Sequence, residues 1–381
     1  MKTLLLKNAN VVLPDREVTG GSVLIEEGRI VSFEAESAAE EIDLAGATLL
    51  PGFIDVHIHG AVGVDVMDAT ASGLREVSEY LASRGVTSWV PTFVPASDEN
   101  YASAIAAISE AMSFDGGARV LGVHYEGPFV NTAQCGALHT EYFKTYASVA
   151  DLNSLPLPSG GVRMITLAPE VNGGIELVRE LKTRGWVISI GHTRADVKVL
   201  DTACEAGAHH MTHFMNAMAP LHHRSPGPIA WGLARDDVTF DYIADGVHLD
   251  PFMLRLLLKV KGVGGISLIS DAIAAAGKGD GDYRIWGETI SVKNGRTANA
   301  SGNIAGSVIS MLDAVQLLHS LGVSYVDLAR MASLNPARLL GLDSVCGSIE
   351  PGKRADLVAL DEDNNPILTI IEGKISRKGA K

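Results

Sequence analysis

Two histidines separated by one residue, His57 and His59, end an apolar run at residues 49–56. Alternate side chains of a β-strand point to the same face, so a strand that ends in His-Ile-His directs two imidazoles toward one point. Paired imidazoles in this geometry are typical ligands of a divalent transition metal. Taken alone, the pair is equally compatible with one histidine capping the strand and the other lying at the surface, so its meaning depends on the rest of the chain.

Four further residues with metal-ligating or acid-base chemistry also stand where apolar runs end: Glu126, His192, His213 and Asp271. They become a single site only if the fold brings the ends of those runs together. Nitrogen and carboxylate donors without a thiolate suit Zn²⁺, Fe²⁺, Co²⁺ or Mn²⁺, and the residue types do not choose among these ions.

The elements that must position these residues form a regular alternation from residue 51 onward. Eight apolar runs read as buried strands, at residues 52–59, 88–94, 120–126, 164–168, 187–192, 209–213, 240–244 and 266–271. Helical patterns lie between most of them, at residues 73–84, 100–112, 175–184, 195–206 and 251–260, and two more follow at 311–321 and 325–340. This pattern predicts a parallel (β/α)8 barrel, in which the carboxyl ends of the strands build the active site.

The two ends of the chain have a different sequence pattern. Residues 1–50 contain short strands and turns, and residues 347–361 return to the same turn-then-strand pattern. Neither end alone has enough strands to bury a face, so we expect them to share one small domain. The predicted organisation is a small β-sandwich domain from residues 1–50 and 346–381, and a barrel from residues 51–345.

Composition limits the partners and the compartment. The 381-residue chain carries a formal net charge of −14, which disfavours nonspecific binding to nucleic acid or to an anionic membrane. It has no uncharged apolar stretch long enough for a membrane span and no recognisable signal peptide, so we expect a cytoplasmic protein. The three cysteines, Cys135, Cys204 and Cys346, are an odd number without CxxC spacing, which argues against both disulfides and a thiolate metal site.

Several motifs carry a family resemblance. The first-strand segment at residues 51–60, Pro-Gly-Phe-Ile-Asp-Val-His-Ile-His-Gly, looks like the signature of the amidohydrolase superfamily. Five more segments resemble the N-acetylglucosamine-6-phosphate deacetylases of that superfamily, at residues 124–129, 191–193, 212–218, 244–248 and 270–272. The resemblance covers essentially the whole chain, and its motifs occur in the family's order and spacing.

The resemblance implies a metal site made by Glu126, His192 and His213. Many relatives bridge two ions with a carboxylated lysine on the fourth strand, but residues 162–168 contain no lysine, so a glutamate must supply the carboxylate. Because His57 and His59 are both present, a second ion bound by these two and Glu126 is compatible with the motif. We therefore expect one or two divalent ions per subunit, with zinc favoured over iron, cobalt and manganese.

Asp271 follows the last strand, close to where an activated water would lie. A carboxylate there can take a proton from water whose pKa the metal lowers toward about 7, and return it to a leaving nitrogen. An additional role for Asp271 as a metal ligand is compatible with this position.

For the substrate, the resemblance implies contacts from several loops. His248 would contact the acyl carbonyl or the sugar, and Asn216 with the backbone N–H of Ala217 would hold a phosphate. Arg224 matches an arginine that relatives present across a dimer interface, which would suit an acidic protein with an anionic ligand. The residues expected to line the sugar site on weaker grounds are Ala137, Ile304, Ala305 and Gly306.

The match departs from the family near Ala137, because the histidine expected beside it stands at His139, which leaves the role of that histidine open. Cys135 in the same loop either modulates access or is inert. Alternation along the strands also predicts that His124 and His209 point inward, packing beneath the ligands.

The leading hypothesis is a metal-dependent hydrolase that converts N-acetyl-D-glucosamine 6-phosphate to D-glucosamine 6-phosphate and acetate. Within enzymes, the alternative is an amidohydrolase for another N-acyl amino sugar phosphate, such as the galactosamine epimer, or for an N-acyl amino acid. A catalytically silent barrel that senses or scaffolds a sugar phosphate is the rival from another class. The expected partners are the sugar phosphate and a second copy of the chain in a homodimer, with no nucleic acid and no membrane.

Overall fold

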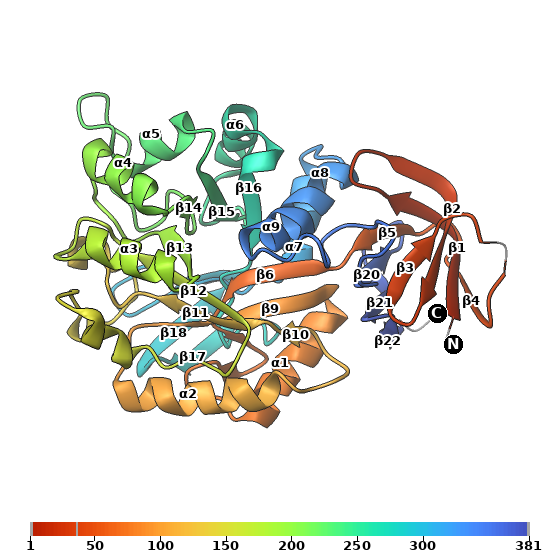
Figure 1. The fold of residues 1–381 in the computed structure, drawn as a ribbon, viewed down its shortest axis with the longest axis horizontal. Coiled ribbons are helices and arrows are strands. Elements are labelled where there is room, and N and C mark those ends of the chain that lie inside the picture. Colours follow the sequence, from red (N-terminus) through yellow and green to blue (C-terminus); the bar gives the residue numbers. More distant parts are fainter. Residues whose placement is uncertain (1–2, 36, 379–381) are drawn as a thin grey trace.

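The computed structural model describes residues 3–35 and 37–378, and it contains a parallel barrel beside a smaller β domain (Figure 1). Eight strands follow one another around the barrel, which confirms the predicted fold class. They are β6 (Phe53–Ile58), β9 (Val86–Phe93), β11 (Gly122–Glu126), β12 (Val162–Leu167), β13 (Val187–Ile190), β14 (His210–Met211), β15 (Thr239–Ile243) and β16 (Ile266–Ile269). A short strand, β10 (Arg119–Val120), pairs with β9.

The barrel closes between its first and last strands, and Asp55 is central to the closure. The amide of Asp271 donates to the carbonyl of His57 at 3.0 Å, which joins the end of β6 to the segment after β16. Asp55 is fully buried on β6, and it accepts hydrogen bonds from the Ser270 hydroxyl at 2.5 Å and from the amides of Ser270 and His57. Burial outweighs these bonds and raises the pKa of Asp55 to about 6.

We predict that Asp55→Ala destabilises the protein by about 3 kcal/mol, because it leaves the buried hydroxyl and amide of Ser270 and the amide of His57 without this acceptor. Guanidinium unfolding measures this loss. The matched control is Asp15→Ala, which removes an exposed carboxylate paired only with Arg16 on the surface and should change stability by less than about 0.5 kcal/mol. A loss below about 1 kcal/mol for Asp55→Ala would show that this closure is not a stabilising feature.

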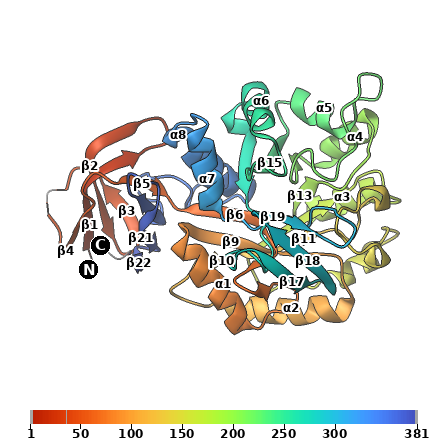
Figure 2. The same ribbon diagram turned by 180° about the vertical axis from the view of Figure 1, so that it is seen from behind.

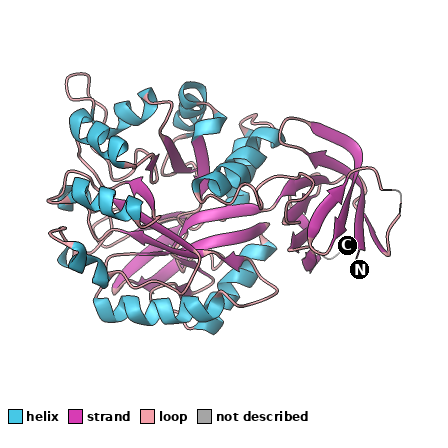
Figure 3. Ribbon diagram, viewed as in Figure 1, coloured by secondary structure: helices cyan, strands magenta, loops and turns pink. Residues whose placement is uncertain are grey.

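The helices pack outside the barrel (Figure 3). They are α1 (Ala71–Ser83), α2 (Asp98–Ala111), α3 (Gly174–Thr183), α4 (Val197–Ala206), α5 (Gly227–Ala234), α6 (Pro251–Lys261), α7 (Met311–Ser320), α8 (Tyr325–Ala329) and α9 (Asn335–Leu339). Short 3₁₀ helices occur at Thr132–Gln134, Thr140–Tyr142, Val149–Ser154 and Val263–Gly265. Side-chain caps fix the starts of several helices; for example, Thr70 accepts from the Gly73 amide and Asp250 from the Phe252 amide.

The predicted helix at residues 325–340 is interrupted. A π-helical turn, Arg330–Leu334, separates α8 from α9. Pro336 explains the interruption, since proline has no N–H to donate and its ring clashes with the carbonyl four residues earlier in a regular α-helix. The wider π turn accommodates the proline without ending the helical path.

The two chain ends meet in one continuous sheet, in the order β22-β21-β20-β5-β1-β2-β3, with β4 also paired to β1. Strand β5 pairs with β1 on one side and with β20 on the other, so it joins the two ends. Its strands are β1 (Thr3–Val12), β2 (Glu17–Glu26), β3 (Arg29–Ser32), β4 (Glu40–Asp43), β5 (Thr48–Pro51), β20 (Leu357–Leu360), β21 (Pro366–Ile371) and β22 (Lys374–Lys378). The sheet surrounds an apolar core of its own, as expected for a small β domain built by both ends, whereas the domain limits stay a prediction.

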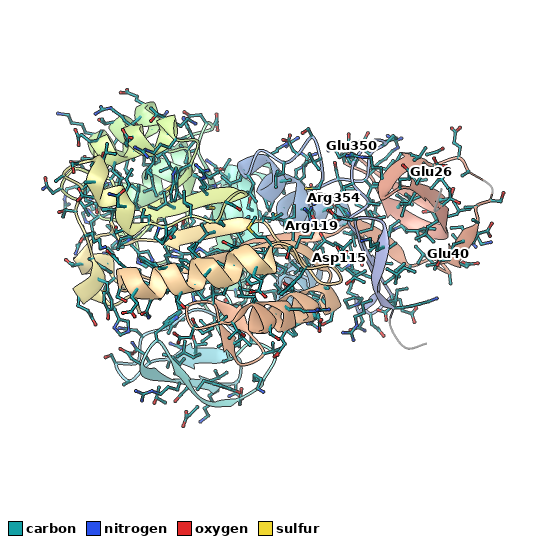
Figure 4. All side chains as sticks on the ribbon, turned by 60° about the horizontal axis from the view of Figure 1, so that its bottom comes forward. Glu26, Glu40, Asp115, Arg119, Glu350 and Arg354 are labelled. Carbon is teal, nitrogen blue, oxygen red and sulfur yellow. The ribbon has the colours of Figure 1, made fainter. Side chains whose placement is uncertain are left out.

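Charged side chains cross the junction between this sheet and the barrel. Figure 4 labels Arg119 and Asp115 on the barrel side and Arg354 from the C-terminal part of the chain. Arg119 pairs with Glu372 at 3.3 Å, and Lys374 pairs with Asp115 at 3.1 Å. These pairs help to hold β21 and β22 against the segment between α2 and β11.

A segment between β16 and α7 forms an antiparallel sheet that the sequence patterns did not predict. It contains β17 (Gly281–Ile285), β18 (Glu288–Lys293) and β19 (Arg296–Ala298), and it projects from the barrel (cyan in Figure 4). A second small pair, β7 (Gly60–Ala61) and β8 (Val64–Asp65), follows β6. Figure 2 shows β17 to β19 from the opposite side.

Candidate metal centre and active site

The histidines that end β6 lie in contact with each other and with Asp271. The Nε2 atoms of His57 and His59 are 3.2 Å apart, and both rings are buried. Oδ1 of Asp271 lies 3.4 Å from Nε2 of His57 and 3.2 Å from Nε2 of His59. Three potential ligand atoms therefore converge on one point at the carboxyl ends of β6 and β16.

A second group forms beside the first around Glu126. Oε1 of Glu126 lies 2.9 Å from Nε2 of His192 and 2.9 Å from Nε2 of His213, and these two nitrogens are 3.1 Å apart. The structure thus brings together Glu126 from β11 with the histidines that follow β13 and β14.

The carboxylate of Glu126 also reaches the first group. Its Oε1 is 3.6 Å from Nε2 of His57, and its Oε2 is 3.4 Å from Nε2 of His59. The carboxylate therefore lies between the two groups, with Oε1 closest to His192 and His213 and Oε2 toward His59, a position from which it could bridge two ions.

These side chains fit a divalent metal. Nδ1 of His59 lies 3.0 Å from the Thr92 carbonyl, and Nδ1 of His192 lies 2.7 Å from the Gln134 carbonyl. A carbonyl only accepts, so each Nδ1 carries the proton and each Nε2 lone pair points into the site. Lone pairs that face one another at such short range need a cation between them, and the donor set of imidazoles and carboxylates suits zinc and related ions.

The carboxylates of the site favour positive charge between them: in the metal-free site that charge would be protons on the imidazoles, and in the metal-bound site it would be the ion, with the Nε2 lone pairs as its ligands. Burial disfavours protonation of His59, but hydrogen bonds to Asp271 and Glu126 outweigh burial and raise its pKa to about 10. Burial would raise the pKa of Asp271, but hydrogen bonds from His57 and His59 hold it well below its usual range. The pKa of Glu126 is likewise held low by the surrounding imidazoles, against the effect of burial. A divalent ion supplies the positive charge that these carboxylates attract.

Three of the same residues have a strained backbone. His192, His213 and Asp271 have φ angles of 48°, 32° and 51°, in the left-handed region that residues with a side chain rarely adopt. Each follows directly on a barrel strand, where the chain turns sharply to direct a side chain toward the barrel axis. Non-glycine residues kept in this region typically mark functional sites.

Buried groups beneath the ligands hold them in place, and one of them differs from the expectation. His124 is buried between the Val56 carbonyl and the Thr166 hydroxyl, and its ring lies 4.9 Å from that of His57. His209, in contrast, is exposed and lies 3.3 Å from Cys204, so its predicted inward position is wrong. His210 takes the inward position and pairs with Asp241, because β14 is short and the chain leaves the strand alternation before His213. Asp241 also accepts the amide of His213.

A cavity of about 410 Å³ opens above the two ligand groups. The predicted substrate residues that line it are Ala137, Asn216, Ala217, His248, Ile304 and Gly306. Ala305 is fully buried behind the wall, where its amide donates to Thr297, so the structure does not bring this residue to the cavity. Arg224 is exposed on the loop before α5, where it contacts His223, and it does not reach the cavity of its own chain.

His248 is held by a neighbouring carboxylate. Its Nδ1 lies 2.7 Å from Oδ2 of Asp245, and its amide donates to Oδ1 of the same residue. Burial raises the pKa of Asp245, but the hydrogen bonds and charge of His248 outweigh this and lower it. The Asp245 contact fixes the orientation of the imidazole that lines the cavity.

Cys135, for which modulation of access was one of two predicted alternatives, also lines the cavity. The lining residues that the sequence patterns missed are Ala133, Gln134, Gly136, Leu138, Asn303 and Trp286. Most belong to the loop around Ala137, a residue that the family resemblance already placed at the sugar site. Trp286 belongs to the unpredicted turn between β17 and β18. The sequence feature that could have indicated a hairpin there is Gly287, because glycine favours the positive φ that a two-residue turn requires.

Comparisons with known proteins agree with this site. Residues 48–376 match the amidohydrolase family profile. N-acetylglucosamine-6-phosphate deacetylase of Bacillus subtilis is 38% identical, with 98% of this chain and 97% of that protein covered. N-acetylgalactosamine-6-phosphate deacetylase of Escherichia coli O157:H7 is also 38% identical, over 86% of this chain and 87% of that protein.

A solved structure shares the whole architecture. It is a mutant N-acetyl-D-glucosamine-6-phosphate deacetylase from Mycobacterium smegmatis in complex with N-acetyl-D-glucosamine 6-phosphate, with a TM-score of 0.89, 31% identity, and coverage of 99% of this chain and 100% of that one. Within residues 3–35 and 37–378, no helix has the length and apolar character needed to cross a membrane. The family match and the relatives show that the chain belongs to the amidohydrolase family and, within it, to the amino sugar phosphate deacetylases typified by the N-acetylglucosamine-6-phosphate enzymes.

Proposed function

We propose that this chain hydrolyses N-acetyl-D-glucosamine 6-phosphate to D-glucosamine 6-phosphate and acetate. The observation that carries the proposal is the arrangement of Glu126, His192 and His213 beside Asp271 on the floor of a cavity that Asn216 and Ala217 also line. The first group suits a metal that activates an amide, and the last two residues suit a phosphate at the opposite end of a sugar.

Glu126, His192 and His213 would hold the proposed metal, with zinc favoured, and His57 and His59 beside Glu126 would hold a second ion if one binds. A divalent ion in such a site polarises the amide carbonyl and lowers the pKa of water. Asp271 takes the proton of the attacking water and then delivers it to the departing amine nitrogen. His248, fixed by Asp245, donates a hydrogen bond to the carbonyl oxygen as negative charge develops there.

A second copy of the chain completes the proposed phosphate site. Among the residues that the structure describes, no lysine or arginine lines the cavity, although a phosphate dianion is held best by a cationic fork. Arg224 is exposed, its guanidinium contacts only the neighbouring His223 among the described residues, and it lies on the loop that follows Asn216 and Ala217. We propose a homodimer in which Arg224 of each subunit reaches the neighbouring cavity.

Subunit mixing tests this arrangement. Arg224→Ala and Asp271→Asn dimers should each have little activity toward the phosphorylated substrate, for different reasons. After the two are mixed and reassembled, about a quarter of the wild-type activity should return, because each mixed dimer has one site with Asp271 and a neighbouring Arg224. Mixtures that stay at the level of the separate variants would show that Arg224 acts within its own subunit or not at all.

Acetate release from a panel of substrates tests the function itself. The panel is N-acetylglucosamine 6-phosphate, N-acetylgalactosamine 6-phosphate, unphosphorylated N-acetylglucosamine and an N-acetyl amino acid. We expect the highest kcat/KM for the first. Preference for the galactosamine epimer would move the chain to the activity named for the Escherichia coli relative, and preference for an unphosphorylated compound would refute the phosphate site.

We also propose a cytoplasmic location. The support is that Cys135, Cys204 and Cys346 are all free thiols, which is usual for proteins kept in a reducing compartment.

A further inference from the structure

Trp286 stands at the tip of a hairpin in a conformation that costs energy. Ile285 pairs with Glu288, so Trp286 and Gly287 form a two-residue turn, with φ angles of 53° and 76°. Such turns favour asparagine, aspartate or glycine at both positions, because a bulky side chain at positive φ clashes with its own backbone. A tryptophan kept at this position indicates that the indole has a function that asparagine could not serve.

The indole forms a wall between two cavities. Its ring lies edge-to-face against His59, with the centroids 5.2 Å apart, so it borders the metal centre directly. It lines the active-site cavity on one side. On the other side it lines a separate cavity of about 350 Å³. The walls of this cavity are mixed: the apolar part includes Met67, Val94, Ala96 and Tyr142, and the polar part Asp68, Asn100, His139 and Glu141.

The strand order shows which part of the substrate faces this wall. Asn216 and Ala217 follow β14, the sixth strand around the barrel, whereas Val94 and Ala96 follow β9, the second strand. The second and sixth strands of an eight-stranded barrel lie opposite each other. A hexosamine 6-phosphate carries its phosphate on C6 and its acyl group on C2, at opposite ends of the sugar. With the phosphate near β14 and the amide at the metal centre, the acyl chain points toward β9 and Trp286.

We propose that Trp286 limits the length of the acyl group that the enzyme removes, and that the cavity behind it is space from which longer acyl chains are excluded. This inference rests on the proposed function, since it concerns the same substrate. The indole leaves room for an acetyl methyl group, and each added methylene meets its face. Removal of the indole joins the two cavities and admits chains such as butyryl into the part of the second cavity that Met67 and Val94 line.

Trp286→Asn is the test variant, because asparagine is favoured at this turn position and should preserve the hairpin. The measurement is kcat/KM for N-acetyl-, N-propionyl- and N-butyryl-glucosamine 6-phosphate. One methylene in an apolar pocket changes discrimination by about 10- to 200-fold, so the acetyl-to-butyryl ratio should fall at least about tenfold in Trp286→Asn. Gly295→Asn, in the β18–β19 turn of the same sheet, is the matched control: a Cβ there meets no atom within 4 Å, the indole stays in place, and the wild-type ratio should persist.

Binding gives a readout that is independent of turnover. In an Asp271→Asn background, calorimetry should show tighter binding of the N-butyryl compound when Trp286→Asn is added, and little change for the N-acetyl compound. An unchanged acyl preference in Trp286→Asn, with an active wild type, overturns this inference alone. A wild type that releases no carboxylate from any of the three compounds overturns the proposed function and this inference with it.

Discussion

Asp271→Asn is expected to lower kcat by at least about 10²- to 10⁴-fold, the usual contribution of a positioned general acid-base group. Asparagine keeps the size of the side chain but neither accepts the proton of the attacking water nor returns it to the amine. Asp271 is buried beside His57 and His59, and Glu126, the other carboxylate that reaches these histidines in the described part of the chain, is assigned in our proposal to holding the metal. Acetate release at saturating substrate measures the effect.

Metal content separates the chemical role of Asp271 from a ligand role. Elemental analysis should find the ion at Glu126, His192 and His213 still bound in Asp271→Asn, with thermal unfolding close to that of the wild type. If Asp271 is also a ligand of the second group, one ion per subunit is lost while the other stays. Activity within about tenfold of the wild type would contradict the assignment of Asp271 as the general acid-base.

Glu126→Ala is expected to remove metal from both groups and to lower activity by about three to four orders of magnitude. The reason is its central position, with Oε1 2.9 Å from His192 and His213 and Oε2 3.4 Å from His59. Glu176→Ala, which removes an exposed carboxylate on α3 paired only with Arg179, is the matched control and should leave metal content and activity unchanged.

The double variant His57→Asn/His59→Asn then shows whether the second ion is needed. It leaves Glu126, His192 and His213 intact, so it should lose one ion per subunit and retain the other. Retained turnover would assign the chemistry to the Glu126 site alone, whereas a loss as large as that of Glu126→Ala would require both ions. Full metal content and activity in Glu126→Ala would contradict the proposed centre as a whole.

Much of the fold and of the metal centre could be predicted from the sequence because both depend on regular patterns. Barrel strands are buried on both faces, so they appear as apolar runs, and the ligands stand at their ends. His57 and His59 face one point because residues two apart in a strand share a face, as their 3.2 Å separation shows. The small domain could be predicted from the shortage of strands at each end.

The features that could not be predicted depend on local geometry rather than on the periodic pattern of apolar residues. His209 was expected to point inward because alternation was extended beyond β14, which spans only His210–Met211. The β17–β19 sheet carries exposed polar residues and a tryptophan at a turn, so it resembles neither a buried strand nor a usual hairpin. Ala305 lies behind the cavity wall. The sequence could not show this, because a backbone contact with substrate places few demands on the type of residue that makes it.

The joining of the two chain ends through β5 has a consequence for synthesis of the protein. All four residues of β5 are buried, and one edge of this strand is covered only by β20, which lies roughly 300 residues later in the chain. At roughly 5–20 residues per second, a ribosome leaves that edge uncovered for about 15–60 seconds while the whole barrel emerges. An open apolar edge is a template for pairing with other chains. The nascent protein is therefore most vulnerable to aggregation in this interval, and chaperone capture of ribosome-bound chains should end only when β20 has left the exit tunnel.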